Sequence, residues 1–179
     1  MRVRVDGKHF AVGESRFPFR GVTYGTFAPR EDDGARFPDT DQVKRDFHAI
    51  AEAGFTVVRT YTAPPDDVLE LAGSCDLKVL AGAFWPDWRY LTGTSRRAAR
   101  RVVAGARAEV AAQARRLAGR DEVLGISLAN EVPADVLRWY GTERIARVID
   151  ELADVVREHD PELLVTYANY PTAEYLPLP

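Results

Sequence analysis

The sequence predicts an α/β fold built on a parallel sheet, and two observations carry that prediction. Apolar, strand-like runs alternate with helix-like segments along most of the 179 residues, and the strand runs are nearly free of charge, as in Val123–Ala129. Strands of a parallel sheet are covered on both faces by crossover helices, so they read as continuous apolar runs. The length suits one domain with a substantial core, so we expect residues 1–179 to form a single domain.

The N-terminal part predicts antiparallel structure before the α/β pattern begins. Residues 2–5 alternate polar and apolar side chains, Asp6-Gly7 is typical of a hairpin turn, and residues 9–12 are expected to form the returning strand. We therefore expect a hairpin within residues 1–16, followed by one strand over Phe17–Tyr24 that opens the β/α repeats of residues 17–170. Residues 171–179 form a proline-rich tail.

The β/α repeats are marked by helix signals at both ends. Asp39, with Gln42 three residues on, resembles a capping box, and Ser95 is an N-cap candidate. Gly54 and Gly119 follow helical patterns as expected for C-terminal stops. The predicted helices are 39–53, 65–72, 95–118 and 142–158, and the strands after the first are 55–60, 77–82, 123–129 and 163–167.

Two architectures fit about five strands and four helices in alternation: an open doubly wound sheet, or part of an eight-stranded barrel. An open sheet that binds nucleotides usually has a glycine-rich phosphate loop after its first strand. Gly21-Val22-Thr23-Tyr24-Gly25 lacks that pattern. The absence favours an incomplete (β/α)8 barrel of the TIM type, preceded by the short hairpin.

In barrels of this kind the active site lies at the carboxyl ends of the strands. The predicted strand ends gather aromatic rings, amides, an arginine and a carboxylate, a set that suits sugars because rings stack on C–H faces while planar polar groups bind hydroxyls. The candidate residues are Tyr24, Arg59, Tyr61, Trp85, Trp88, Asn130, Glu131 and Asn169.

The strand end Asn130-Glu131, followed by Val132-Pro133, is the most informative of these sites. A carboxylate at the rim of a sheet is expected to be partly desolvated, which raises its pKa toward that of a general acid. Three alternatives stay open: Glu131 could satisfy free amides at a helix N-terminus, Arg59 could pair with an acid at the edge of the core, and the tryptophans could anchor a loop.

Three motifs, in order, resemble the first half of a glycoside hydrolase clan A barrel, close to the family 2 catalytic domain. Phe17-Pro18-Phe19-Arg20-Gly21-Val22-Thr23-Tyr24 is similar to the first strand of that family, and Phe55–Arg59 is similar to the second, with its arginine at the rim. Asn130-Glu131 is similar to the Asn-Glu pair that ends the fourth strand. The resemblance covers nearly the whole chain.

The resemblance implies roles for these residues in retaining hydrolysis. Glu131 would be the general acid/base, Asn130 would bind the sugar 2-hydroxyl, and Arg59 would position a catalytic carboxylate. Tyr24, Tyr61, Trp85, Trp88 and Asn169 would bind substrate.

A retaining mechanism needs a second carboxylate about 5–5.5 Å from the first, which the clan carries at strand seven. We expect this nucleophile to be missing from the chain, since neither Asp87 nor Glu174 matches its position. A C-terminal half or a second copy would have to supply it.

The leading function is therefore hydrolysis of O-glycosyl bonds. The alternatives are a non-catalytic carbohydrate-binding or remnant domain, associated with a glycosyltransferase that builds polysaccharide, and a sugar-phosphate enzyme. No cofactor or metal is expected, because the three histidines are scattered and the lone Cys75 has no His-Cys cluster around it.

Charge and hydropathy argue against a nucleic-acid-binding protein and against a membrane-spanning one. The net charge of −3 argues against a nucleic-acid partner, and the arginines of residues 96–120 are interpreted as the solvated face of an amphipathic helix. No apolar run is long enough for a membrane span and no leader is recognised, so the default location is the cytoplasm.

Overall fold

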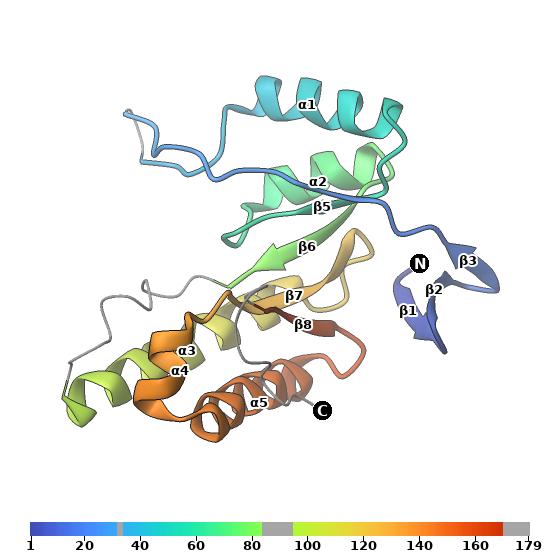
Figure 1. The fold of residues 1–179 in the computed structure, drawn as a ribbon. Helices are drawn as coiled ribbons and strands as arrows, with labels where there is room; N and C mark the ends of the chain where they lie inside the picture. The colour runs from blue at the N-terminus through green and yellow to red at the C-terminus, as the bar shows by residue number, and fades with distance from the viewer. Residues whose placement is uncertain (32–33, 84–94, 170–179) are drawn as a thin grey trace. The chain divides into compact units, whose positions relative to one another are not determined.

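The computed structural model of the protein describes residues 1–31, 34–83 and 95–169 (Figure 1). In these residues the strands and helices follow the predicted alternation. The strands are β1 (Val3–Asp6), β2 (His9–Val12), β3 (Ser15–Phe17), β4 (Gly21–Thr23), β5 (Val57–Arg59), β6 (Lys78–Gly82), β7 (Val123–Asn130) and β8 (Leu164–Ala168). The helices are α1 (Thr40–Glu52), α2 (Asp66–Ser74), α3 (Arg96–Leu117), α4 (Ala134–Tyr140) and α5 (Thr142–His159).

The strands form two sheets. β1, β2 and β3 make a three-stranded antiparallel sheet, and β4 to β8 make a five-stranded sheet in the order of the chain. β4 pairs with β5, and β5 with β6, in parallel. A parallel sheet whose successive strands are joined through helices is the α/β fold that the sequence predicts.

The single strand predicted for Phe17–Tyr24 is wrong, because the segment is divided between the two sheets. Phe17 pairs with Phe10 in the antiparallel sheet, whereas Gly21 pairs with Val57 in the parallel one. Pro18 has no N–H and cannot continue a ladder, so the chain leaves the first sheet there. The Thr56 hydroxyl then fixes the bend: it accepts from the Arg20 N–H at 3.0 Å and donates to the Pro18 carbonyl.

The predicted helix ends are confirmed at four positions. The Asp39 carboxylate accepts from the Gln42 N–H at 2.8 Å, and the Ser95 hydroxyl accepts from the Ala98 N–H at 3.2 Å. Gly54 and Gly119 have φ of +83° and +72°, the left-handed conformation in which glycine ends helices. Helix α4 was not predicted, because its seven residues follow Pro133 without a full apolar period.

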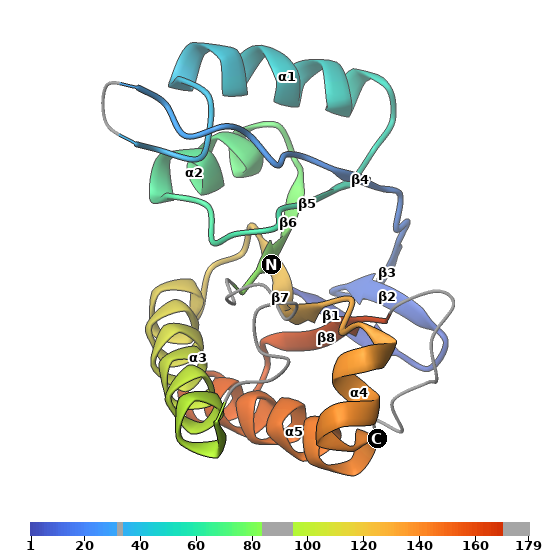
Figure 2. The same cartoon turned by 60° about the vertical axis from the view of Figure 1, so that its left-hand side comes forward.

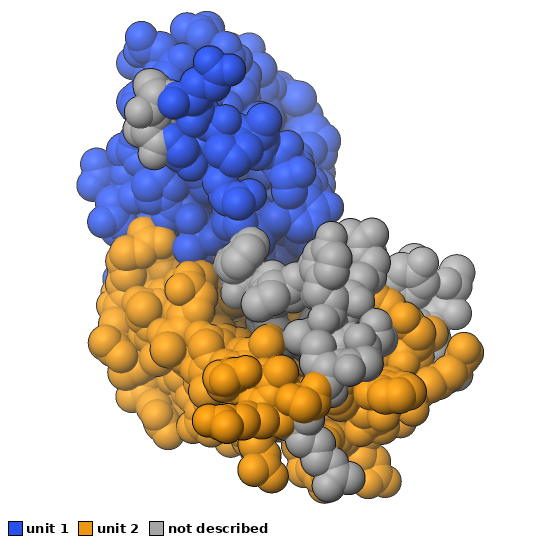
Figure 3. Space-filling model, turned by 90° about the vertical axis from the view of Figure 1, so that its left-hand side faces the viewer, with its two compact units in different colours: residues 1–81, 119–125 blue, residues 82–118, 126–179 orange. Residues whose placement is uncertain are grey.

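The chain divides into two compact units, which Figure 3 colours separately: residues 1–81 with 119–125, and residues 82–118 with 126–179. In unit 1, α1 packs against α2, and Val43, Phe47 and Leu69 are fully buried. Polar contacts join distant parts of this unit: Arg120 pairs with Asp66 and Glu122.

Unit 2 is built around the contact between α3 and α5, which lie side by side in Figures 1 and 2. Val110 and Leu117 of α3 and Leu152 and Val156 of α5 are fully buried. The arginines of α3 that the structure describes lie on its polar side, most of them exposed, so the predicted amphipathic helix is confirmed.

Candidate functional site

Glu131 lies directly after β7, as predicted, and its backbone is unusual. Its φ is +46°, in the left-handed region that few residues other than glycine adopt. Two hydrogen bonds to β8 hold this turn: the Glu131 N–H donates to the Ala168 carbonyl at 2.8 Å, and the Val132 N–H donates to the Tyr167 hydroxyl at 3.0 Å. The turn at the end of β7 is therefore fixed from the neighbouring strand.

The Glu131 side chain is exposed, so the expected partial desolvation is wrong for this structure. Among the described residues its carboxylate makes no hydrogen bond or ion pair. Helix α4 begins nearby after Pro133, with no side-chain oxygen capping it within the described part of the chain. The capping alternative therefore has no support there, and the carboxylate is accessible to a ligand.

Tyr167 is an ionisable group whose pKa depends on its contacts with this turn. Burial raises the pKa of its phenol, the hydrogen bond from the Val132 N–H acts in the opposite direction, and the negative charge of Glu131 raises the pKa further. The phenol therefore stays protonated at neutral pH. Its hydroxyl oxygen accepts from the Val132 N–H, and the hydroxyl keeps its own proton as a hydrogen-bond donor.

The two predicted amides lie at the ends of β7 and β8. Asn130 is the last residue of β7 and is exposed. Asn169 follows β8, and its Oδ1 is buried without a hydrogen-bond partner among the described residues. Asn130, Glu131 and Asn169 thus come from neighbouring strand ends of unit 2. Their sugar contacts stay predictions.

In unit 1 the ends of β4 and β5 bring together three predicted residues. Arg59 is the last residue of β5, and its guanidinium carbon lies 5.1 Å from the centre of the Tyr61 ring. A cation over an aromatic face is an attractive arrangement that holds both groups. The Tyr24 N–H donates to the Arg59 carbonyl at 2.8 Å, which extends the pairing of β4 and β5 by one residue.

Tyr24 is largely buried in unit 1, with 7% of its surface exposed. Its ring packs edge-on against Phe27 and Phe47, with centroids 4.8 and 5.1 Å away. Its hydroxyl donates to Asp46 Oδ2 at 2.7 Å. Burial and the Asp46 carboxylate raise the pKa of Tyr24 well above its usual value. These contacts favour a packing role, and its role as a sugar platform stays a prediction.

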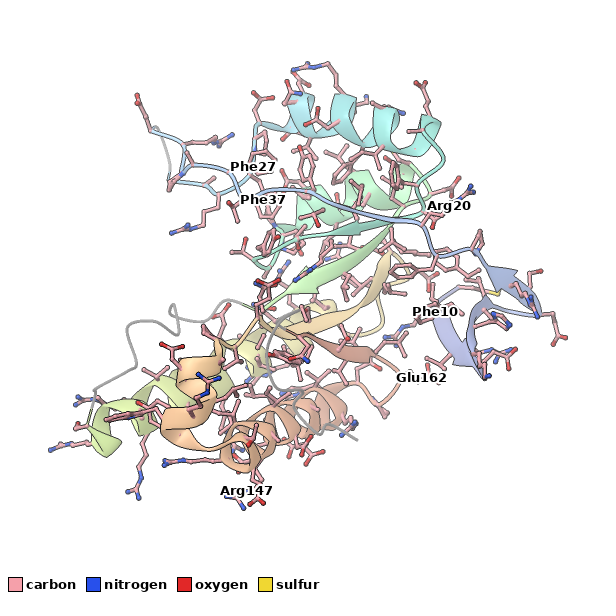
Figure 4. The ribbon with its side chains drawn as sticks, in the orientation of Figure 1. Phe10, Arg20, Phe27, Phe37, Arg147 and Glu162 are labelled. Atoms are coloured by element: carbon pink, nitrogen blue, oxygen red, sulfur yellow. The ribbon has the colours of Figure 1, made fainter. Side chains whose placement is uncertain are left out.

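A small pocket opens beside these residues in unit 1. Figure 4 labels Phe27 and Phe37 on its aromatic side, where the ring centroids are 6.5 Å apart. Its walls come from the end of β4, from the loop before α1 and from the residues after β5. They are Tyr24, Gly25, Thr26, Phe27, Arg36, Phe37, Tyr61 and Thr62.

Sequence reasoning missed Arg36 and Phe37, which the long loop before α1 brings to this pocket. Loop residues have no periodicity, and no signal in the sequence tied them to the strand ends.

Trp85 and Trp88 lie outside the described residues. Within the described part, no His, Cys, Asp or Glu residues cluster in a way that could hold a metal ion. None of its helices combines the length and apolar character of a membrane span.

Comparison with known proteins gives a clear result for structure and none for sequence. No family model matches the chain, and no curated protein matches it. Among solved structures, a glycoside hydrolase is similar over 90% of this chain and 57% of its own, with a TM-score of 0.68 and 17% identity.

Two further structures come from named bacteria. GH5_18 from Streptomyces cattleya, in complex with GlcNAc, is similar over 77% of this chain and 41% of its own, with a TM-score of 0.61 and 22% identity. The β-glucuronidase of Parabacteroides merdae is similar over 88% of this chain and 19% of its own, with a TM-score of 0.67 and 16% identity.

The fold is that of part of a TIM barrel, the fold class that the sequence predicts. The comparison decides between the two architectures that the sequence left open, in favour of the barrel. The chain spans little more than half the length of the glycoside hydrolase named first. In a barrel of this type the carboxyl ends of the strands carry the active site, and Arg59, Asn130, Glu131 and Asn169 all lie at such ends.

Proposed function

We propose that this protein takes part in the hydrolysis of O-glycosyl bonds, with Glu131 as the general acid/base. The observation that carries the proposal is the turn after β7. The chain accepts a left-handed backbone at a glutamate, fixes it with two hydrogen bonds to β8, and leaves the carboxylate without a partner among the described residues. Such conformations persist where the surrounding structure supports them, typically at functional sites.

Glu131 would first protonate the glycosidic oxygen and then activate water. Asn130 would bind the sugar hydroxyl beside the broken bond, and Arg59 would hold a catalytic carboxylate ionised. The substrate-binding roles of Tyr61, Asn169, Tyr24, Trp85 and Trp88 belong to this proposal too. Among the described residues at the carboxyl ends of β4 to β8, the one carboxylate is that of Glu131. The nucleophile of a retaining mechanism would therefore have to come from another part of the protein or from a partner.

The leaving group provides the test of a general acid. A dinitrophenolate departs without a proton, whereas an alkyl or sugar leaving group needs one. We expect Glu131→Gln to lower kcat/KM on an alkyl glycoside by about 10²–10⁴-fold, the usual contribution of acid–base catalysis. On the dinitrophenyl glycoside, the same variant should lose far less kcat/KM, because that leaving group departs without a proton.

Glu143→Gln is the matched control, because Glu143 is an exposed glutamate in the first turn of α5 and lies outside the strand ends. It should leave both rates unchanged. Equal losses on the two substrates in Glu131→Gln would remove Glu131 as the proton donor.

A second function is supported by the exposure of Glu131, which lacks the desolvation expected of a general acid. It is a non-catalytic carbohydrate-binding domain, which would serve a polysaccharide-building glycosyltransferase. Oligosaccharide binding that persists without turnover, in the wild type and in Glu131→Gln alike, would favour this function over hydrolysis.

A further inference from the structure

The first half of α3 carries an unusual concentration of positive charge. Between Ser95 and Ala108 the sequence has five arginines and no acidic residue. Arg97, Arg100 and Arg101 are exposed, and none of them makes an ion pair among the described residues. Like charges one turn apart repel each other and also oppose the positive end of the helix dipole. The arrangement works against helix stability, so stability does not explain it.

The contact between α3 and α5 extends this charge across two helices. Arg107 Nη1 lies 3.3 Å from Glu151 Oε2, and Arg115 Nε lies 3.5 Å from His159 Nε2. Both pairs join residues that are 44 apart in sequence, so the helices run in the same direction at a constant offset. Arg100 lies two helical turns before Arg107 in α3, and Arg144 lies two turns before Glu151 in α5. The same offset of 44 residues therefore places Arg100 opposite Arg144 on the paired helices.

Arg147 lies one turn beyond Arg144 on the same side of α5, and Figure 4 shows its side chain extending outward from the helix. The acidic residues of this half of α5 are Glu143 and Asp150, fewer than the arginines around them. The local excess of positive charge stands in a chain whose net charge is −3.

An aromatic surface adjoins this charge at the start of α5. Trp139, near the end of α4, is 65% exposed. The next residue, Tyr140, lies with its ring centre 5.9 Å from the guanidinium carbon of Arg144. Helix α4 contacts α5, so the indole and the arginines belong to neighbouring parts of unit 2. An indole this exposed to solvent offers a large apolar face on which a ligand ring can stack favourably.

We propose that Arg100, Arg101, Arg144 and Arg147, together with Trp139, form a binding face for an anionic polysaccharide. The fork of a guanidinium matches a carboxylate or sulfate, and several arginines in rows suit a polymer that repeats its charge. The indole would stack on a sugar ring of the same chain. These arginines would suit other polyanions as well, and the choice of a polysaccharide as the ligand rests on the proposed function.

The test measures binding separately from hydrolysis. Isothermal titration calorimetry would use oligogalacturonate and the full chain carrying Glu131→Gln. We expect binding that weakens as salt rises, because the contacts are ionic. Adding Arg100→Gln and Arg144→Gln together should raise Kd by about tenfold or more, and Trp139→Ala should raise it as well. Cellohexaose, the neutral probe, should bind at least about tenfold more weakly.

Arg157→Gln is the matched control, since Arg157 is an exposed arginine at the other end of α5 that pairs with Asp154 at 2.9 Å. It should leave Kd unchanged. All substituted side chains are exposed, and an unchanged melting temperature would show that the variants fold.

Three outcomes would overturn the inference: no binding of oligogalacturonate, equal binding of cellohexaose, or tighter binding of single-stranded DNA through the same arginines. Glycoside hydrolysis without binding of the acidic oligomer would overturn this inference alone. Binding without hydrolysis would support it while removing the proposed catalytic function.

Discussion

Glu131 illustrates what sequence and structure each contribute at the scale of the residue. A glutamate at the end of an apolar strand could be located from the sequence. Its left-handed backbone could not, because it depends on hydrogen bonds to β8, in which Ala168 lies 37 residues after Glu131 and Tyr167 lies 35 residues after Val132. Tertiary hydrogen bonds of this kind override local preference.

Tyr24 gives a prediction about pH at the same scale. Its folded-state pKa lies above the ordinary value of about 10, because burial and Asp46 disfavour the phenolate. Since a raised pKa contributes stability that is lost on deprotonation, the wild type should lose stability as pH rises above about 10. Tyr24→Phe cannot lose this contribution, so its free energy of unfolding should fall less steeply there.

At neutral pH Tyr24→Phe should be less stable than the wild type by about 1–2 kcal/mol, because the hydrogen bond to Asp46 is lost. Urea unfolding at a series of pH values measures both effects. Tyr61→Phe, at an exposed tyrosine, is the control and should follow the wild type. Parallel curves for Tyr24→Phe and the wild type would show that the phenol does not govern alkaline stability.

At the scale of the element, the N-terminus of α3 combines a good cap with unfavourable charge. Ser95 accepts from the Ala98 N–H, and Ser95→Ala should lower stability by about 1 kcal/mol. Aspartate caps as well as serine and also places a negative charge among the arginines at the positive end of the helix. Ser95→Asp should therefore raise stability by about 0.3–1 kcal/mol. Thermal unfolding measures both changes.

Ser74→Ala is the control, since the Ser74 hydroxyl donates to the Leu71 carbonyl at the exposed end of α2 and caps no N-terminus. It should change stability by less than about 0.5 kcal/mol. If Ser95→Asp destabilised the protein as much as Ser95→Ala, the cap and dipole account of α3 would be wrong. The same aspartate should weaken oligogalacturonate binding, because it neutralises part of the basic face.

Local signals explain which elements the sequence could predict. Helix-end signals act on the backbone within one turn, and the two helices that carry them at both ends, α1 and α3, were predicted. These signals are Asp39 and Gly54 for α1, and Ser95 and Gly119 for α3. Pro18 acts locally as well, but a proline within a strand-like run fits an edge strand as readily as a break. Helix α4 and the pocket residues Arg36 and Phe37 depend on distant contacts, for which the sequence has no periodic pattern.

At the scale of the whole molecule, the boundary between the two units falls inside strands. It crosses β6 between Ala81 and Gly82, and β7 between Gly125 and Ile126. Independent domains are usually joined by exposed linkers with few contacts across them. A boundary within hydrogen-bonded strands instead predicts that the chain unfolds as one cooperative unit, as expected for the single domain that the length suggested.

Two core variants test this cooperativity. Phe47 is fully buried in unit 1 and Leu152 in unit 2, so replacing either with alanine leaves a cavity and should cost about 2–5 kcal/mol. If the chain unfolds as one unit, each variant should lower the melting temperature of one shared transition by a similar amount. Differential scanning calorimetry, with amide exchange followed in both units, measures this. Two transitions, each shifted by one variant alone, would show instead that the units fold independently despite the strands that run through their boundary.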